Sequence, residues 1–267
     1  MTKFIWQRMQ RQSFHVGIWL GVLLALLHVF TRVLPLITSN DVLFTPFTMW
    51  LGIDSFSVLN LLFYLLLPFL SSLAFADFLK RDITSGFLQQ IKLSLPIRRY
   101  YRIIFWVTFI SGACLIALPL LINLVASSLV LPSYLPDELL NNNIAMRANS
   151  TLFVGLYYSH PVLHQLFYLL LAAIFGGFGL FACFTLALSL WLKQPLVALF
   201  AAFLLQLLLY LLNSLLFMNT TITPFDFLPE TVLLRSVQLS VVLSTALCLI
   251  VCSSLFYVIG VKRHVWL

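Results

Sequence analysis

The sequence predicts an all-α membrane protein with six transmembrane helices. Hydrophobic residues make up 62% of the 267 residues and charged residues only 9%, with a mean hydropathy of +1.05. A soluble domain carries roughly 25% charged residues. Six long stretches contain no Asp, Glu, Lys or Arg, and the basic residues crowd into alternate gaps between them. A chain this apolar cannot present a hydrated surface on all sides, so we expect its solvent to be lipid.

Each span is placed where a charge-free stretch reaches the about 20 residues that a helix needs to cross the hydrocarbon core. The stretches lack the alternating pattern of a membrane barrel, so the spans are expected to be helices. The stretch 148–192 receives one span, because its first part is polar and is interrupted by Pro161. The first stretch is too long for the apolar core of a signal peptide and is expected to remain as a span. The expected helices lie near residues 14–37, 57–79, 103–130, 162–192, 195–217 and 236–260, within a single transmembrane domain covering residues 1–267.

The charges predict the orientation. Twelve of the fifteen basic residues fall on one side of the six spans, and six of the eight acidic residues fall on the other. The positive-inside rule then places both termini in the cytoplasm. The strongest orienting residues lie in the gap between the second and third spans and include Arg81, Arg98, Arg99 and Arg102. Arg32, near the outer end of the first span, can extend its long stem to the interface.

The segments outside the bilayer are short. Residues 1–13 place Phe4, Ile5 and Met9 on one helical face, with basic residues elsewhere, which predicts an amphipathic helix lying on the inner leaflet. The outer loops are too short for a folded extracellular domain of ordinary size. Apolar loop residues such as Trp50 and Leu51 are expected to dip back into the interface.

The cytoplasmic segment 77–102 has a helical pattern of its own. Ile83, Phe87, Ile91 and Leu95 recur every four residues, which is typical of an amphipathic helix at a membrane surface. Pro96 is expected to end this helix, because its ring disfavours helical geometry in the residue before it.

The motifs of this segment follow a fixed order. An acidic residue, Asp77, ends the second span, and Thr84-Ser85-Gly86, the amphipathic run and Ser94-Leu95-Pro96 follow. This order resembles the coupling segment of permease subunits of type-2 ABC exporters. The segments 158–161, 176–179 and 189–193 also resemble such permeases. The acidic stretch of the family is thinned here, and Leu95 separates Ser94 from Pro96.

The resemblance implies a non-enzymatic permease subunit of a bacterial plasma membrane, carrying an amphipathic or hydrophobic cargo such as a peptide, lipid or drug. Its partners would be two copies of a separate ABC ATPase, a second copy or a sister permease, and the lipid bilayer, but no nucleic acid. The chain has no phosphate-binding loop, so the partner would hold ATP and Mg²⁺, and no cofactor, metal or catalytic residue is expected here. The docking residues that the resemblance implies are Asp82, Ile83, Thr84, Gly86, Phe87, Gln90, Ile91 and Pro96.

Three other interpretations stay open. One is a permease similar to haem exporters, and another is a scaffold or immunity protein without ATP coupling. The third, an intramembrane enzyme, is disfavoured because both glutamates, Glu138 and Glu230, fall in outer loops. The spans contain no mid-span Asp, Glu, Lys or Arg, which argues against an ion-driven carrier.

Several intramembrane residues invite a structural interpretation. Asn123, Gln206 and Asn213 are expected to hydrogen-bond neighbouring helices or line a path. Carbonyls freed by Pro68 and Pro119 are expected to find partners on neighbouring helices. Gly176, Gly177 and Gly179 allow close approach of helices, for which a dimer seam is one candidate. The four cysteines show no disulfide or metal spacing, and His160 and His164 are too few for a metal site.

Overall fold

The computed structural model describes residues 12–37, 43–54, 56–73, 79, 82–83, 85–88, 96–139, 150–177, 181–192, 194–216, 221–231 and 236–265. Every regular element in these ranges is a helix, as the sequence predicts. Five apolar helical stretches are long enough to cross a membrane: Ser13–Leu36, Ile97–Val130, Pro161–Ser189, Leu196–Leu216 and Leu239–Arg263. An apolar helix of 15 residues, α4 (Val58–Ser72), lies beside them and is shorter than the expected span 57–79.

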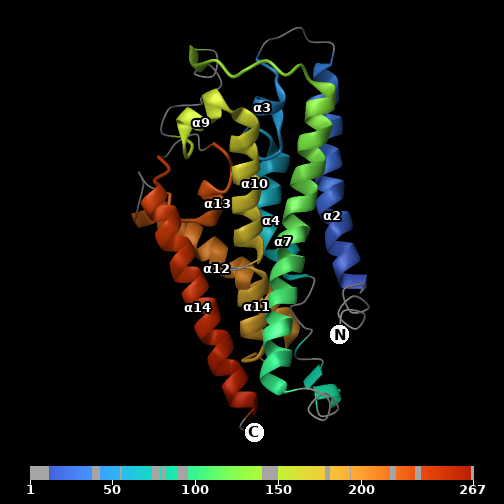
Figure 1. Ribbon diagram of the computed structural model, residues 1–267, viewed down its shortest axis with the longest axis vertical. Coiled ribbons are helices and arrows are strands. Elements are labelled where there is room, and N and C mark those ends of the chain that lie inside the picture. Colours follow the sequence, from blue (N-terminus) through green and yellow to red (C-terminus); the bar gives the residue numbers. More distant parts are fainter. Residues whose placement is uncertain are drawn as a thin grey trace.

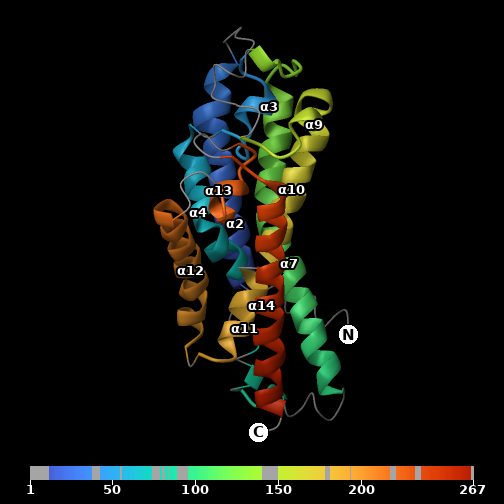
Figure 2. The same cartoon turned by 90° about the vertical axis from the view of Figure 1, so that its left-hand side faces the viewer.

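The long helices run side by side in one elongated bundle (Figures 1 and 2). One end of the bundle carries Arg98 and Lys262, and we call it the basic end. Helix α2 (Gln12–His28) begins toward this end, and α14 (Leu239–Val265) ends there. The opposite end, which holds α3 (Pro46–Met49), α9 (Val154–Ser159) and Asp137, is called the acidic end. Within the described residues, the basic side and the acidic side that the sequence predicts therefore lie at opposite ends of the bundle.

Helix α7 (Ile97–Val130) is the centre of the packing. It contacts α2, α4, α10 (Pro161–Gly177) and α11 (Ala182–Ser189). Helix α14 packs mainly on α11, and α12 (Pro195–Leu216) packs on α4 and α11. The outer faces of α12 and α14 stay apolar and exposed, for example at Leu215 (73%) and Leu247 (66%). A soluble surface rarely exposes such continuous apolar faces, so these faces suit lipid.

Glycines allow α7 and α10 to touch. A Cβ added at Gly177 would lie 2.5 Å from a ring carbon of Phe109 and 2.7 Å from its carbonyl oxygen. A Cβ at Gly112 would lie 3.0 Å from the carbonyl oxygen of Gly176. The close approach predicted for Gly176 and Gly177 therefore occurs within the chain. Both glycines pack against α7 and are not available to a dimer seam. Gly179 lies outside the described residues.

Prolines interrupt the helices, and neighbouring residues compensate. Pro68 has no N–H to donate to the carbonyl of Tyr64, and the side-chain Nε2 of Gln206 on α12 donates to that carbonyl instead at 3.0 Å. This confirms the expectation for Pro68. After α2 the helical path continues as a π turn, Val29–Val33, and then as a 3₁₀ turn, Leu34–Leu36, where Pro35 lacks the N–H that an α-helix would need.

The segment 50–54 enters the acidic end of the bundle instead of only touching the interface. Trp50 and Leu51 are completely buried, and the indole N–H of Trp50 donates to the carbonyl of Leu120 at 3.0 Å. The segment 228–231, which follows α13 (Pro224–Phe227), meets it from the other side. The backbone N–H of Glu230 donates to the carbonyl of Gly52 at 2.8 Å. These two loops close the acidic end and carry their acidic side chains inward.

Candidate functional site

The first candidate site lies at the basic end, where α7 begins. Pro96 caps the helix with an extended backbone, and α7 starts at Ile97, six residues earlier than predicted. Proline suits this boundary because it lacks an N–H, and the first N–H groups of a helix have no partner within it. Arg98, Arg99 and Arg102 consequently project from the first turns of the helix, not from a linker before it.

The described part of the segment before α7, residues 79, 82–83 and 85–88, is attached to this start of α7. The carboxylate of Asp82 is 2% exposed and accepts a hydrogen bond from the hydroxyl of Tyr100. Leu79 and Leu88 are buried in one apolar cluster with Tyr100 and Leu186, so the segment contacts both α7 and α11. A shift of residues 79–88 would therefore be transmitted to these two helices.

The predicted docking residues divide into three groups. Asp82, Ile83 and Phe87 pack on the bundle itself, so part of the amphipathic stripe is used internally. Gly86 adopts a positive φ of 71°, with open space where a Cβ would lie, and forms a turn beside the exposed Ser85, which is not itself a predicted docking residue, while Pro96 caps α7. Thr84, Gln90 and Ile91 lie outside the described residues, as do the orienting residue Arg81 and residues 1–11 of the predicted surface helix.

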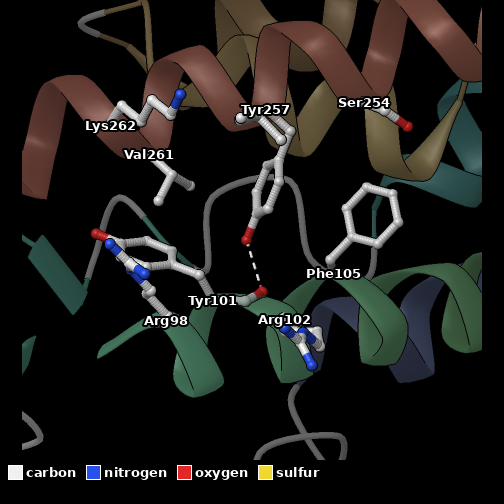
Figure 3. A pocket seen from close by; sticks show the side chains of 9 residues that line it. Arg98, Tyr101, Arg102, Phe105, Ser254, Tyr257, Val261 and Lys262 are labelled. Carbon is white, nitrogen blue, oxygen red and sulfur yellow. Dashed lines mark hydrogen bonds between the residues drawn. The ribbon is translucent and has the colours of Figure 1, made fainter. Parts of the chain in front are cut away.

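A groove opens beside this end, between the first turns of α7 and the last turns of α14 (Figure 3). Its volume is about 480 Å³. Arg98, Arg102 and Phe105 line one wall, and Val258 and Lys262 line the other. The hydroxyl of Tyr257 on α14 donates to the carbonyl of Tyr101 on α7 at 2.7 Å and ties the walls together (Figure 3).

A second group of polar residues is buried at the acidic end. Asn123 accepts a hydrogen bond from the backbone N–H of Leu51 at 2.8 Å, which fixes the orientation of its amide. Its Nδ2 then donates to the carbonyl of Ala25 at 3.0 Å and to Nδ1 of His28 at 3.2 Å. Because Nδ1 accepts, the proton of a neutral His28 ring sits on Nε2, which lies 3.3 Å from Asp54. Asn123 thus joins α2, α7 and the segment 50–54, which is one of the two roles that the sequence predicts for it.

Asp54 is compensated by a cation. Arg32 donates from Nε to Oδ2 at 3.0 Å and from Nη2 to Oδ1 at 3.3 Å, and its side chain remains 40% exposed. Burial alone would raise the pKa of Asp54, but the hydrogen bonds from His28 and Arg32 and the charge of Arg32 hold the pKa below its ordinary value. Arg32 therefore does more than reach the interface, because it neutralises a buried carboxylate.

A second histidine–carboxylate pair joins α10 to the loop 228–231. Nδ1 of His164 is hydrogen-bonded to Oε1 of Glu230, and both side chains are completely buried. Nε2 of His164 lies 2.7 Å from the carbonyl of Leu152, which only accepts, so Nε2 carries a proton. One further proton is shared between Nδ1 and Oε1, and the pair is neutral overall whichever atom holds it. Burial raises the pKa of Glu230 above its ordinary value.

These pairs correct the prediction that the acidic residues stay in outer loops. Asp54 and Glu230 belong to loops, but both loops fold into the bundle, and the carboxylates are 3% and 0% exposed. The available signal was the apolar character of the loop 221–231, in which Glu230 follows Phe227, Leu228 and Pro229. Among the described residues, no group of three or more His, Cys, Asp or Glu is arranged to hold a metal ion.

The pH dependence of stability tests the Asp54 cluster. Because the folded-state pKa of Asp54 is lowered, its contribution is present above the ordinary pKa of about 4 and is lost as the pH falls through the lowered value. Asp54→Asn is expected to unfold at a lower temperature than the parent protein at pH 7, and the difference should shrink below about pH 4. Thermal unfolding of the purified protein across this range measures both; a difference that stays constant would contradict the assignment.

Comparisons of the chain with models of known families, with curated proteins and with solved structures find no match.

Proposed function

We propose that this protein is the membrane-spanning permease subunit of an ATP-driven exporter, with six crossings and both termini in the cytoplasm. In this proposal α4 is the short second crossing, and the basic end faces the cytoplasm. A separate ATPase, present in two copies, binds ATP and Mg²⁺, and a second permease subunit completes the path for an amphipathic or hydrophobic cargo. The membrane is the plasma membrane of a bacterium.

The observation that carries the proposal is the attachment of the coupling segment. Asp82, Leu79 and Leu88 anchor it to α7 and α11, while Ser85, at the turn before Gly86, stays exposed. An ATPase that engages this turn can push on two helices through contacts that are buried. A permease needs such a link, because ATP binding can shift it between two states only through a contact that differs between them.

The distribution of charge supports the orientation. Arg98, Arg99, Arg102 and Lys262 are exposed at the basic end, whereas the described acidic residues other than Asp82 lie toward the other end. The positive-inside rule favours the cytoplasm for the basic end. This places the turn at Ser85 where a cytoplasmic ATPase can reach it.

A bulky side chain at the exposed turn tests the docking role. Ser85→Trp is expected to reduce co-purification of the ATPase at least about tenfold. The variant should stay folded, because Ser85 is exposed and does not belong to the buried cluster. The matched control is Ser159→Trp, the same change at an exposed serine of the acidic end. Co-purification measured by quantitative mass spectrometry should be normal for Ser159→Trp. Equal ATPase recovery with both variants would contradict docking at this turn.

A further inference from the structure

The groove between α7 and α14 carries an excess of positive charge. Arg98, Arg102 and Lys262 line it and are exposed, and none of the described residues lining it is acidic. The described chain contains no ion pair to any of the three. Figure 3 shows that these cations come from both walls. An anion between the helices could therefore be approached from two sides.

The groove also has a gradient of polarity along the helices. On α7 the lining runs from Arg98 to Phe105, seven residues further along and about 10 Å toward the middle of the bundle. On α14, which runs the opposite way, it goes from Lys262 back to Val258 and Ser254. Cations thus lie at the open basic end and mainly apolar side chains lie deeper, an order that matches a phospholipid with its phosphate outermost and its acyl chains inward.

One buried donor in the groove lacks a partner. Tyr101 is 2% exposed and is one of the residues that line the groove, and its hydroxyl makes no hydrogen bond with any described atom. A buried hydroxyl without a partner costs about 1–3 kcal/mol. A phosphate oxygen in the groove would accept from this hydroxyl and from the cations beside it.

From these three features we propose that the groove binds an anionic phospholipid of the adjacent leaflet, with its phosphate held by Arg98, Arg102, Lys262 and the Tyr101 hydroxyl. The acyl chains would lie against Phe105 and the exposed side chain of Val258. A lipid is the occupant because the deep part of the groove is apolar and belongs to helices long enough to span a membrane. An anionic headgroup is favoured because basic residues near a leaflet attract anionic lipids by about 1 kcal/mol each. The site does not depend on the proposed transport function.

Lipid retention by the purified full-length chain tests this site. The protein is exchanged into a neutral detergent, titrated with phosphatidylglycerol or phosphatidylcholine, and weighed intact by native mass spectrometry. We expect phosphatidylglycerol to bind at least about tenfold more tightly than phosphatidylcholine, and the triple variant Arg98→Gln/Arg102→Gln/Lys262→Gln to lose this preference. Equal binding of the two lipids by the parent protein would overturn the proposal.

Two further variants separate the site from general surface charge. Arg99→Gln removes an exposed cation from the same turn of α7 but outside the groove, and is expected to leave phosphatidylglycerol binding within about twofold of the parent. Tyr101→Phe removes only the hydroxyl that lacks a partner, and is expected to weaken binding about tenfold without lowering the unfolding temperature. If Arg99→Gln weakened binding as much as the changes at Arg98, Arg102 and Lys262, the attraction would be diffuse and the groove would not be the site.

Discussion

Replacing His164 by leucine is expected to destabilise the protein by about 3–5 kcal/mol, because it leaves the buried carboxyl of Glu230 without its partner. The carbonyl of Leu152 loses its donor in the same change. Since burial raises the pKa of Glu230, the deficit should grow as the pH rises above the ordinary glutamate pKa of about 4, because the folded variant must keep a proton that the unfolded chain releases. Thermal unfolding of the detergent-purified variant at several pH values measures both effects.

The matched control replaces Glu230, the acid left without a partner, by a neutral amide. His164→Leu/Glu230→Gln is expected to be more stable than His164→Leu alone, and its deficit relative to the parent should no longer grow with pH, because an amide does not titrate. A double variant that is no more stable than the single one would show that the pair does not carry the stability of this loop.

Replacing Asn123 by leucine is expected to cost about 2–4 kcal/mol. The change removes the acceptor of the Leu51 N–H and the donor to His28, and both groups are buried at the junction of α2, α7 and the segment 50–54. Each buried polar group left without a partner costs about 1–3 kcal/mol. The release of segment 50–54 should also expose Trp50, so its fluorescence should shift to the red before global unfolding.

A serine five residues further along α7 serves as the control for Asn123. Ser128 donates only to the carbonyl of Leu124 in its own helix, so Ser128→Ala is expected to change stability by less than about 0.5 kcal/mol. Equal effects of Asn123→Leu and Ser128→Ala would contradict the role given to the amide in joining three segments.

The helices of the bundle could be predicted because their signal is local. A charge-free stretch of about 20 residues identifies a span on its own, and both ends of α12 and the start of α10 fall within one residue of the prediction. The start of α7 was placed too late because the prediction treated basic residues as the end of a helix. Arg98 and Arg102 extend a helix as readily as leucine does, and hydration of their charge needs only the surface of the bundle.

The buried acids of the acidic end could not be predicted from local pattern. Asp54 and Glu230 become acceptable inside the bundle only through partners far away in the sequence, 22 and 66 residues from Arg32 and His164. A hydropathy pattern shows which loop contains a charged residue. It does not show which of these loops folds into the bundle. The absence of acids from the middle of the predicted spans therefore weighs less against ion-coupled transport, although the Arg32–Asp54 and His164–Glu230 pairs are each neutral overall and are explained as structural links.

The candidate site at the basic end was foreseen in part. The amphipathic stripe marked residues 77–102 as a special segment, and Leu79, Asp82 and Leu88 show that the described part of it packs on the bundle. The groove could not be foreseen, because Arg102 and Lys262 are 160 residues apart in the sequence and are brought together only by the packing of α14 beside α7.

Isolation of the tagged chain from its native membranes in mild detergent, with its partners identified by mass, tests the central claim most directly. The proposed permease should come out with a stoichiometric ATPase that contains a phosphate-binding loop, and Ser85→Trp should lose that partner. A chain that comes out alone, or only with proteins that lack such a loop, would contradict the exporter function and favour a scaffold or immunity protein in its place.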